Sequence, residues 1–241
     1  MSRAALALAL AALTLSGCET TAEESARLER QAKAHTVRVH HTSLVARVER
    51  ESTKVRVIST TLLRSSEATA AVVGVQNTSS TPLRDIPIEL TVHGASGASV
   101  YSNATDEEAA SLVTIPLLAA HGALDWVDDQ VRASATPVSV SARIGEGSAV
   151  DTATPAITVS GELTEEAGSQ AVSGEVSNHS AVEQHELVVY CVALRGARIV
   201  AAGRAVIAQA PANASTHYEL FLEGDASGAQ LQLSAPASTL G

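Results

Sequence analysis

The chain has few aromatic residues, few cysteines and fewer basic than acidic residues. Aromatic residues make up 2% of its 241 residues while 45% are hydrophobic, so a core has to be built from Val, Ile, Leu and Ala. Two cysteines exclude a disulfide-dense scaffold and a zinc site made of several thiolates. The formal charge of −10 argues against nucleic-acid binding, because such a protein needs a basic face toward the phosphates.

The motifs of common enzyme classes are missing as well. The sequence holds no G-x-S-x-G nucleophile elbow, no H-E-x-x-H pair and no G-x-x-x-x-G-K-[ST] phosphate loop. Cys191 lies within an apolar run, where a thiol is expected to be buried and unreactive. We therefore expect no catalytic residue, no metal site and no dissociable cofactor. The enzymatic alternative is a hydrolase whose site is assembled from residues distant in the sequence.

The densest group of carboxylates is formed by Asp125, Asp128 and Asp129, around Trp126. Calcium needs several oxygen ligands, but the spacing and the central glycine of an EF-hand loop are absent. We interpret the group as the acidic end of a strand, in which Trp126 supplies aromatic volume to the core.

The first residues are typical of a targeting sequence. Arg3 precedes an unbroken run of Ala, Leu and one Thr over 4–15, which is too short to cross a bilayer as a permanent helix. A charged start followed by a short apolar stretch indicates a secretory signal peptide. The run ends in Leu15-Ser16-Gly17-Cys18, which resembles the lipobox of bacterial lipoproteins.

The lipobox resemblance implies a signal peptide over 1–17 and a mature chain that starts at Cys18. This cysteine would carry a covalent diacylglycerol, with or without an N-acyl chain. Because several acyl chains bind a membrane more firmly than one, we expect the protein to be lipid-anchored on the extracytoplasmic face of a bacterial membrane. An ordinary signal peptide that contains a cysteine by chance is the alternative.

Residues 18–36 are rich in helix formers, and Thr21 followed by Glu24 fits a capping box. Leu28 is the only large apolar residue of this segment, so no wide core-facing stripe exists. We expect a helical spacer between lipid and fold; a docking helix is the alternative.

From about Val37 the sequence changes to short apolar runs of β type, separated by Gly, Asn, Ser and Pro. In one of them Ile88, Leu90 and Val92 alternate with polar residues and are expected to face a core. The pattern predicts a mainly β fold of antiparallel sandwiches. The runs are 37–39, 45–48, 55–57, 70–76, 86–93, 99–101, 112–118, 123–127 and 138–144.

The pattern then repeats at a spacing of roughly one hundred residues, the size of an immunoglobulin-like (Ig-like) sandwich. The stretches 72–77, 93–100 and 138–142 return as 172–178, around 196–199 and as 231–235. We therefore expect two tandem domains, over 37–147 and 148–241, with the boundary in the Gly- and Pro-containing segment 145–155.

The order of strands and turns in the two copies resembles the FxLYD-type Ig-like domains of bacterial envelope lipoproteins. The stretches that carry the resemblance are Gly74–Asn77 with Ile86–Val92, Gly174–Asn178 with Leu187–Val192, Trp126, and Tyr218–Phe221. The resemblance implies two tandem Ig-like antiparallel β-sandwiches. It implies a fold more than a function, because such sandwiches host many functions.

Four Asn-x-Ser/Thr sequons occur, at Asn77, Asn103, Asn178 and Asn213. Because a lipobox belongs to bacterial chains, we interpret these asparagines as turn residues rather than glycosylation sites.

One strand departs from simple alternation. In the run 187–194, Val188, Tyr190 and Val192 line a second apolar face, although a sandwich strand normally presents one of its faces to water. This face either packs against the first domain or is an exposed apolar patch that binds a partner.

Together these features predict a non-catalytic binding or adaptor module at the bacterial cell envelope. Its partners would be the membrane, through the lipid, and an unidentified envelope protein or glycan, but no nucleic acid. The alternative is an accessory subunit of an envelope transport or assembly complex.

Overall fold

The computed structural model describes residues 48–65, 68–104, 110–166 and 169–241. The chain divides into two compact units, Met1–His41 and Thr42–Gly241, and all described residues belong to the second. The predicted signal peptide, Cys18, the predicted spacer over 18–36 and the predicted strand over 37–39 lie outside the described residues. Of the predicted strand over 45–48 only Val48 is described, and it is not in a strand. Below, residues 48–150 are called the first half and 151–241 the second half.

The described residues are mainly β, with several antiparallel sheets and one helix, α2 (Ala110–Val113). The prediction of a mainly β, sandwich-type fold is therefore confirmed at this level. The predicted strand over 112–118 is wrong at its start, because Leu112 and Val113 belong to this helix and the strand begins at Thr114.

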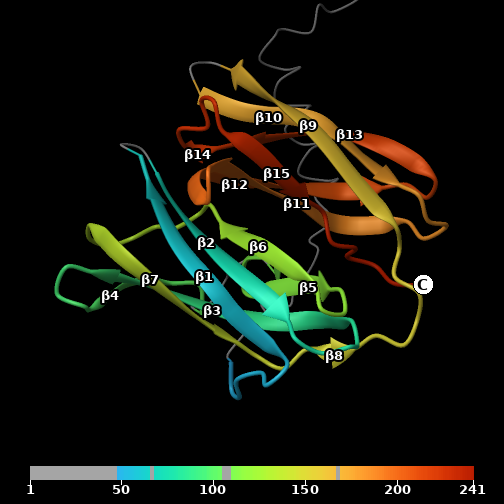
Figure 1. Cartoon of the computed structure of the whole chain (residues 1–241), viewed down its shortest axis with the longest axis horizontal. Coiled ribbons are helices and arrows are strands. Elements are labelled where there is room, and N and C mark those ends of the chain that lie inside the picture. Colours follow the sequence, from blue (N-terminus) through green and yellow to red (C-terminus); the bar gives the residue numbers. More distant parts are fainter. Residues whose placement is uncertain (1–47, 66–67, 105–109, 167–168) are drawn as a thin grey trace, which may run out of the picture. The chain divides into compact units, whose positions relative to one another are not determined.

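The first half forms two sheets. One has the order β1-β2-β6, and in the other β3 pairs with β5 and β8 through its first residues and with β4 and β7 through its last (Figure 1). The strands are β1 (Val55–Arg64), β2 (Thr69–Asn77), β3 (Leu83–Gly94), β4 (Ser99–Ser102), β5 (Thr114–Leu118), β6 (Ala123–Asp128), β7 (Pro137–Ile144) and β8 (Ser148–Ala149). β8 follows directly on the predicted domain boundary at 147/148 and pairs with the first half.

The second half forms sheets of order β13-β10-β9 and β14-β12-β11-β15. The strands are β9 (Ile157–Glu166), β10 (Ser169–Asn178), β11 (Gln184–Arg195), β12 (Arg198–Ala210), β13 (Ala214–Phe221), β14 (Glu223–Gly224) and β15 (Gln230–Ser234). The pairings of β1, β2, β3, β6 and β7 recur in β9, β10, β11, β13 and β15. The continuous β12 pairs with β11 where β4 and β5 pair with β3.

Backbone geometry recurs together with the pairing. Asp85 and Glu186 each stand eight residues after the asparagine that ends the preceding strand, and both have a positive φ, 51° and 52°. Gly97 and Gly196, in the turns that follow β3 and β11, also have positive φ. The same local irregularities therefore occupy the same places in both halves.

The alignment of 138–142 with 231–235 is wrong by two residues. Counted from Asn77 and Asn178, Val92 corresponds to Ala193, and their partners across the sheet are Val140 and Leu231. The two copies of this strand share only an alternation of apolar and polar residues, with several small polar residues. Because every second side chain of a strand lies on the same face of the sheet, a shift of two residues leaves each side chain on its predicted face.

The cores follow the predicted faces. Ile88, Leu90 and Val92 are fully buried, and the polar residues between them are half-buried. Trp126 is also fully buried, in the apolar cluster of the first half, as its role in supplying aromatic volume predicts. Cys191 is buried in the cluster of the second half, where burial raises the pKa of its thiol to about 12.

Candidate functional site

A buried asparagine closes the loop after the second strand of the first half. The Nδ2 of Asn77 donates to the carbonyl oxygens of Thr81 at 2.8 Å and Ala119 at 3.0 Å. Its Oδ1 accepts from the backbone N–H of Ser79 at 3.0 Å and from the Ser79 hydroxyl at 2.8 Å. The amide thereby joins two loops that lie far apart in the sequence, and the sequon serine is part of the same network.

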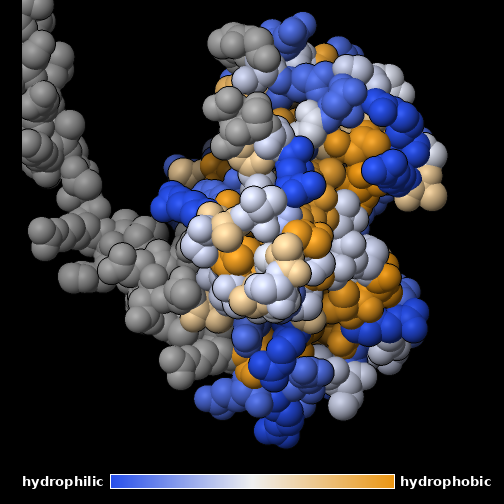
Figure 2. Space-filling model, turned by 90° about the vertical axis from the view of Figure 1, so that its left-hand side faces the viewer, coloured by the Kyte–Doolittle hydropathy of each residue, from blue (hydrophilic) through white to orange (hydrophobic). Residues whose placement is uncertain are grey.

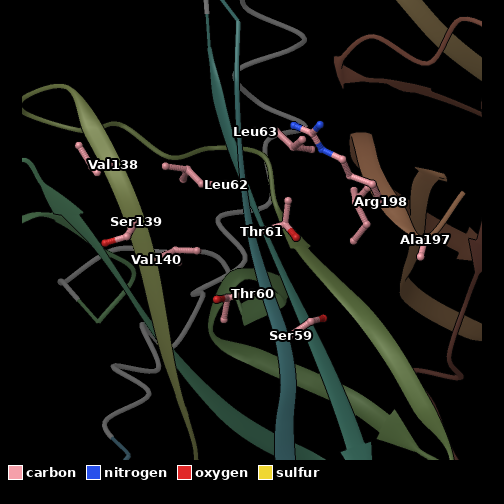
Figure 3. A pocket seen from close by; sticks show the side chains of 11 residues that line it. Ser59, Thr60, Thr61, Leu62, Leu63, Val138, Ser139, Val140, Ala197 and Arg198 are labelled. Atoms are coloured by element: carbon pink, nitrogen blue, oxygen red, sulfur yellow. The ribbon is translucent and has the colours of Figure 1, made fainter. Parts of the chain in front are cut away.

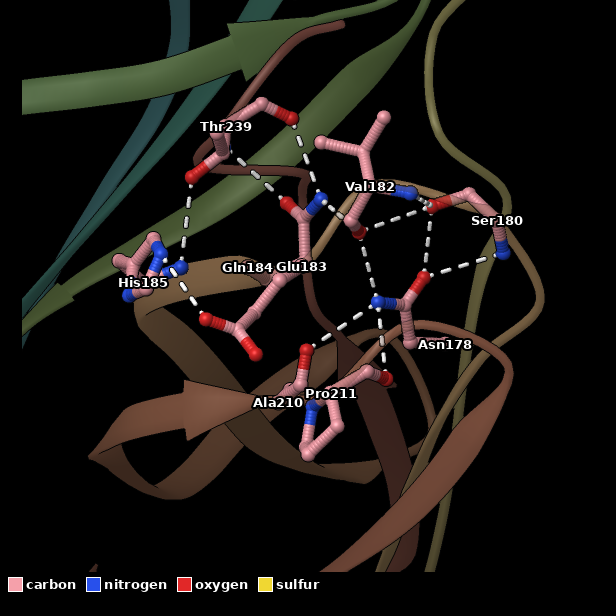
Figure 4. Close-up of polar contacts among 9 residues, drawn as sticks. All are labelled: Asn178, Ser180, Val182, Glu183, Gln184, His185, Ala210, Pro211 and Thr239. Atoms are coloured by element: carbon pink, nitrogen blue, oxygen red, sulfur yellow. Dashed lines mark hydrogen bonds and ion pairs between the residues drawn. The ribbon is translucent and has the colours of Figure 1, made fainter.

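The second half repeats this network around Asn178 (Figure 4). Its Nδ2 donates to the carbonyls of Val182, Ala210 and Pro211, and its Oδ1 accepts from Ser180 through N–H and hydroxyl. At two of the four sequons, the asparagine thus forms the same hydrogen-bond network in both halves. Their interpretation as turn residues is right but incomplete, because the recurring Asn-x-Ser pattern already signals equivalent positions.

The other two sequons do not share one role. Asn213 has a φ of 54° in the turn between β12 and β13, as a turn residue should. Asn103 is buried and ties β3 to the helix α2, since its Oδ1 accepts from Leu90 N–H at 2.7 Å and its Nδ2 donates to Leu112 O at 2.6 Å.

Gln184 is a buried polar residue that sequence reasoning missed. Its Oε1 accepts from the backbone N–H groups of Ser238 and Thr239, at 2.9 and 3.1 Å, and its Nε2 donates to the carbonyls of Thr239 and Val182 (Figure 4). The side chain therefore pins residues near the C-terminus to the start of β11. The sequence did contain a signal for it: Gln184 stands at the position that corresponds to the apolar Leu83 of the first half. Leu83 pairs with β8.

Val188, Tyr190 and Val192 lie buried between the two halves. They belong to the same apolar cluster as Trp126 and Val127, and β6, which carries these two residues, contacts both β11 and β12 (Figure 1). Each of the three side chains is at most 2% exposed. The second apolar face of β11 is thus covered by the first half and is not an open patch in this structure.

A buried ion pair joins the halves beside this face. The Nε of Arg204, on β12, lies 2.9 Å from Oδ1 of Asp129, and the Arg204 backbone N–H donates to Oδ2. The Nη1 of Arg204 also donates to the hydroxyl of Ser111 at 2.9 Å. The arginine side chain is 4% exposed, so its charge is buried against partners from the first half.

Asp128 is fully buried next to this pair. Its carboxylate accepts from the hydroxyl of Tyr101 at 2.7 Å and from the backbone N–H of Gln130 at 2.9 Å. Burial raises the pKa of Asp128 to about 6, although both hydrogen bonds and the charge of Arg204 act in the opposite direction. The predicted acidic strand end is therefore part of the contact between the halves, and sequence gave no signal for the partner Arg204.

An open groove lies between β1 and β7, with a volume of about 600 Å³ (Figure 3). Its walls are Ser59–Leu63 and Val138–Val140 from the first half and Ala197–Ile199 from the turn between β11 and β12. Arg198 is its one charged lining residue, and the other lining residues are aliphatic or carry hydroxyl groups. On the side of the molecule where β7 lies, hydrophobic residues gather between hydrophilic ones (Figure 2).

The lining residues of this groove offer hydroxyl groups, one guanidinium and aliphatic side chains. Hydroxyls and one guanidinium can donate hydrogen bonds, and the aliphatic side chains can take up apolar groups. Among the described residues, no three His, Cys, Asp or Glu side chains gather closely enough to hold a metal ion. No helix in the described part of the chain is long and apolar enough to span a bilayer.

Comparisons with known proteins give little guidance. No family model matches the chain, and no curated protein matches it. Among solved structures, an exo-chitosanase of Amycolatopsis orientalis in complex with PNP-beta-D-glucosamine shows a similarity at 12% sequence identity and a TM-score of 0.24. The match covers 73% of this chain and 25% of the chitosanase chain, so this chain spans a small part of that enzyme.

The asparagine network predicts a large loss of stability on Asn178→Ala. The substitution leaves buried carbonyls of two loops without a donor, so we expect the free energy of unfolding to fall by about 3 kcal/mol. Urea denaturation measures this. Asn213→Gly is the control, since glycine adopts its positive φ freely and stability should hardly change. A similar small effect of both substitutions would contradict a structural role for Asn178.

The raised pKa of Asp128 predicts that this group stabilises the fold in acid. Because the folded-state pKa of about 6 lies above the ordinary 3.8, the stabilisation is complete below about pH 4 and is lost as the pH rises through 6. The loss amounts to at most about 3 kcal/mol.

Asp128→Asn mimics the protonated acid and should flatten this part of the pH profile. Urea midpoints of both proteins between pH 4 and pH 7 give the difference, with the exposed Asp151→Asn as the matched control. Parallel profiles of wild type and Asp128→Asn would show that Asp128 titrates normally.

Proposed function

We propose that this chain is a non-catalytic lipoprotein that serves as a binding or adaptor module on the extracytoplasmic face of a bacterial membrane. In this proposal two tandem Ig-like sandwiches are held at the membrane by acyl chains on Cys18. The lipobox pattern supports the anchor. The recurring strand order, the two asparagine networks and the paired positive-φ residues Asp85 and Glu186 support the tandem repeat.

The observation that carries the proposal is the groove shared by the two halves. Its third wall, Ala197–Ile199, comes from the second half and lies against β1 and β7 of the first. The buried face of β11 and the Arg204–Asp129 pair hold that wall in place. A groove made by two halves locked together is suited to recognition, because a pre-organised surface loses little entropy when a partner binds.

The lining chemistry favours an adaptor over an enzyme. Hydrolysis requires an activated nucleophile or a general acid and base near the substrate. The groove residues offer hydroxyls and Arg198, and none of the lining residues is a carboxylate, histidine or cysteine that could serve as their base. Binding of a polar partner needs only the donors and apolar contacts that the groove supplies.

In-cell cross-linking of the tagged protein tests this function, run beside Cys18→Ala and Cys191→Ala. We expect the wild type and Cys191→Ala to fractionate with membranes and to cross-link to a discrete envelope component. Cys18→Ala should leave the membrane fraction, because it removes the acylated residue while the control removes the only other cysteine.

Membrane retention of Cys18→Ala would contradict the anchor. The absence of any discrete cross-linked component from wild-type cells would contradict the adaptor function. A component captured by the anchored forms alone would indicate that the lipid positions the sandwiches against a membrane-bound partner.

A further inference from the structure

A second groove lies between the two halves, on the side where the C-terminal residues lie (Figure 1). Its walls are the end of β5 and the start of β6 from the first half, and the start of β9 and residues 233–237 from the second. Its volume is about 470 Å³. None of its lining residues is charged, and only Thr158 and Ser234 carry a polar side chain, so we call it the apolar groove.

A carboxylate lies next to the apolar groove on β6. Ala123, which lines the groove, and Asp125 share one face of β6, because alternate side chains of a strand point to the same side. This face is turned toward the second half, since Val127, the next residue on it, belongs to the same apolar cluster as Tyr190 of β11. Two residues of a strand span about 7 Å, so Asp125 is within reach of a long side chain that lies in the groove.

Glycine at position 74 leaves room above the sheet beside this carboxylate. Gly74 pairs with Asp125 on one side and with Ser59 on the other. A Cβ atom at position 74 would collide with the Ser59 hydroxyl and would lie 3.2 Å from Oδ1 of Asp125. The two polar side chains therefore lean over Gly74 from the two neighbouring strands.

Asp125 is half-buried, and its carboxylate has no hydrogen-bond or ion-pair partner among the described residues. Burial raises the pKa of Asp125 above the ordinary 3.8, and no hydrogen bond or neighbouring charge contributes to this shift. Arg56, in the adjacent row of the same face, donates to Oε1 of Gln76 instead. A partly desolvated carboxylate without a partner gains more from a cation than a fully hydrated one does.

Apolar walls next to a single carboxylate match the side chain of lysine. Lysine has a flexible four-carbon stem that can lie along apolar surface, and its ammonium group carries three hydrogen-bond donors and no acceptor. The net charge of −10 also favours the approach of a basic partner over an acidic one.

We propose that the apolar groove and Asp125 together bind a lysine side chain of a partner polypeptide, with the aliphatic stem along the groove and the ammonium group on the Asp125 carboxylate. The Ser59 hydroxyl, which leans over Gly74 beside Asp125, is a second acceptor for this ammonium group. This inference rests on the proposed adaptor function and names the chemistry by which the partner is recognised.

The test uses the full chain in detergent and a fluorescent seven-residue peptide of glycine and serine with one central lysine. A matched peptide carries norleucine in place of the lysine, which keeps the four-carbon stem and removes the charge. We expect the wild type to bind the lysine peptide about tenfold more tightly than the norleucine peptide in fluorescence anisotropy.

Asp125→Asn removes the charge with little change of shape, so it should lower the affinity for the lysine peptide about tenfold and leave that for the norleucine peptide unchanged. Ala123→Phe fills the apolar groove from an exposed position and should weaken both peptides. Glu162→Gln removes an exposed carboxylate of β9 that does not line the groove, and this matched control should bind as the wild type does. Unchanged urea midpoints of all three variants exclude misfolding as the cause.

No binding to the wild type, equal binding of the two peptides, or an undiminished preference for lysine in Asp125→Asn would overturn the inference. Displacement of the lysine peptide by an equal concentration of butylamine would also overturn it, because the occupant would then be a small amine. A wild-type dimer in sedimentation that Asp125→Asn dissociates would identify a second copy as the occupant and overturn it as well.

Cross-linking in cells separates this inference from the proposed function. If Asp125→Asn captures the envelope component as efficiently as the wild type, recognition of lysine by Asp125 is wrong and the adaptor function stands. If the wild type captures no component, the adaptor function itself fails.

Discussion

The described structure depends on burial of the second face of β11 against the first half. This strand is apolar on both faces, so it needs cover on both, and its own sandwich supplies only one. The first half covers Val188, Tyr190 and Val192 through the apolar cluster around β6. Since the turn that follows β11 forms one wall of the groove, the groove exists only because this contact is made.

The polar groups at this contact set its geometry more than its strength. A buried ion pair such as Arg204–Asp129 gains little net free energy over apolar packing, because both charges lose their hydration. The Tyr190 hydroxyl and the Trp126 indole N–H are buried without a partner among the described residues, which adds a further cost. An interface held by such groups excludes alternative arrangements, because any shift would leave the arginine and the carboxylates unpaired.

The two halves share some structural features and differ in others. Both keep the buried asparagine that joins two loops, and both keep the positive-φ residue that follows it. They differ at the periphery: β12 is continuous where the first half has β4, α2 and β5, and Gln184 pins the C-terminal residues where the first half adds β8. The conserved parts are those on which closure of each sheet pair depends.

The sequence by itself determined that the fold is mainly β and which faces of several strands are buried. Alternation fixed the inward face of Ile88, Leu90 and Val92, and an apolar run fixed the burial of Cys191, because these depend on local periodicity. It also marked the repeat, although with a two-residue error where the copies share only alternation. The sequence also showed that both faces of β11 are apolar, but it did not show which residues cover the second face.

Only the tertiary structure decided the pairing of Arg204 with Asp129, 75 positions apart in the chain, and the meeting of three separate segments at the groove. Such contacts depend on which sheet edges and turns come together in space. The local sequence pattern does not encode these contacts, because arginines, acidic strand ends and turns look the same in sequence whether or not they find a partner.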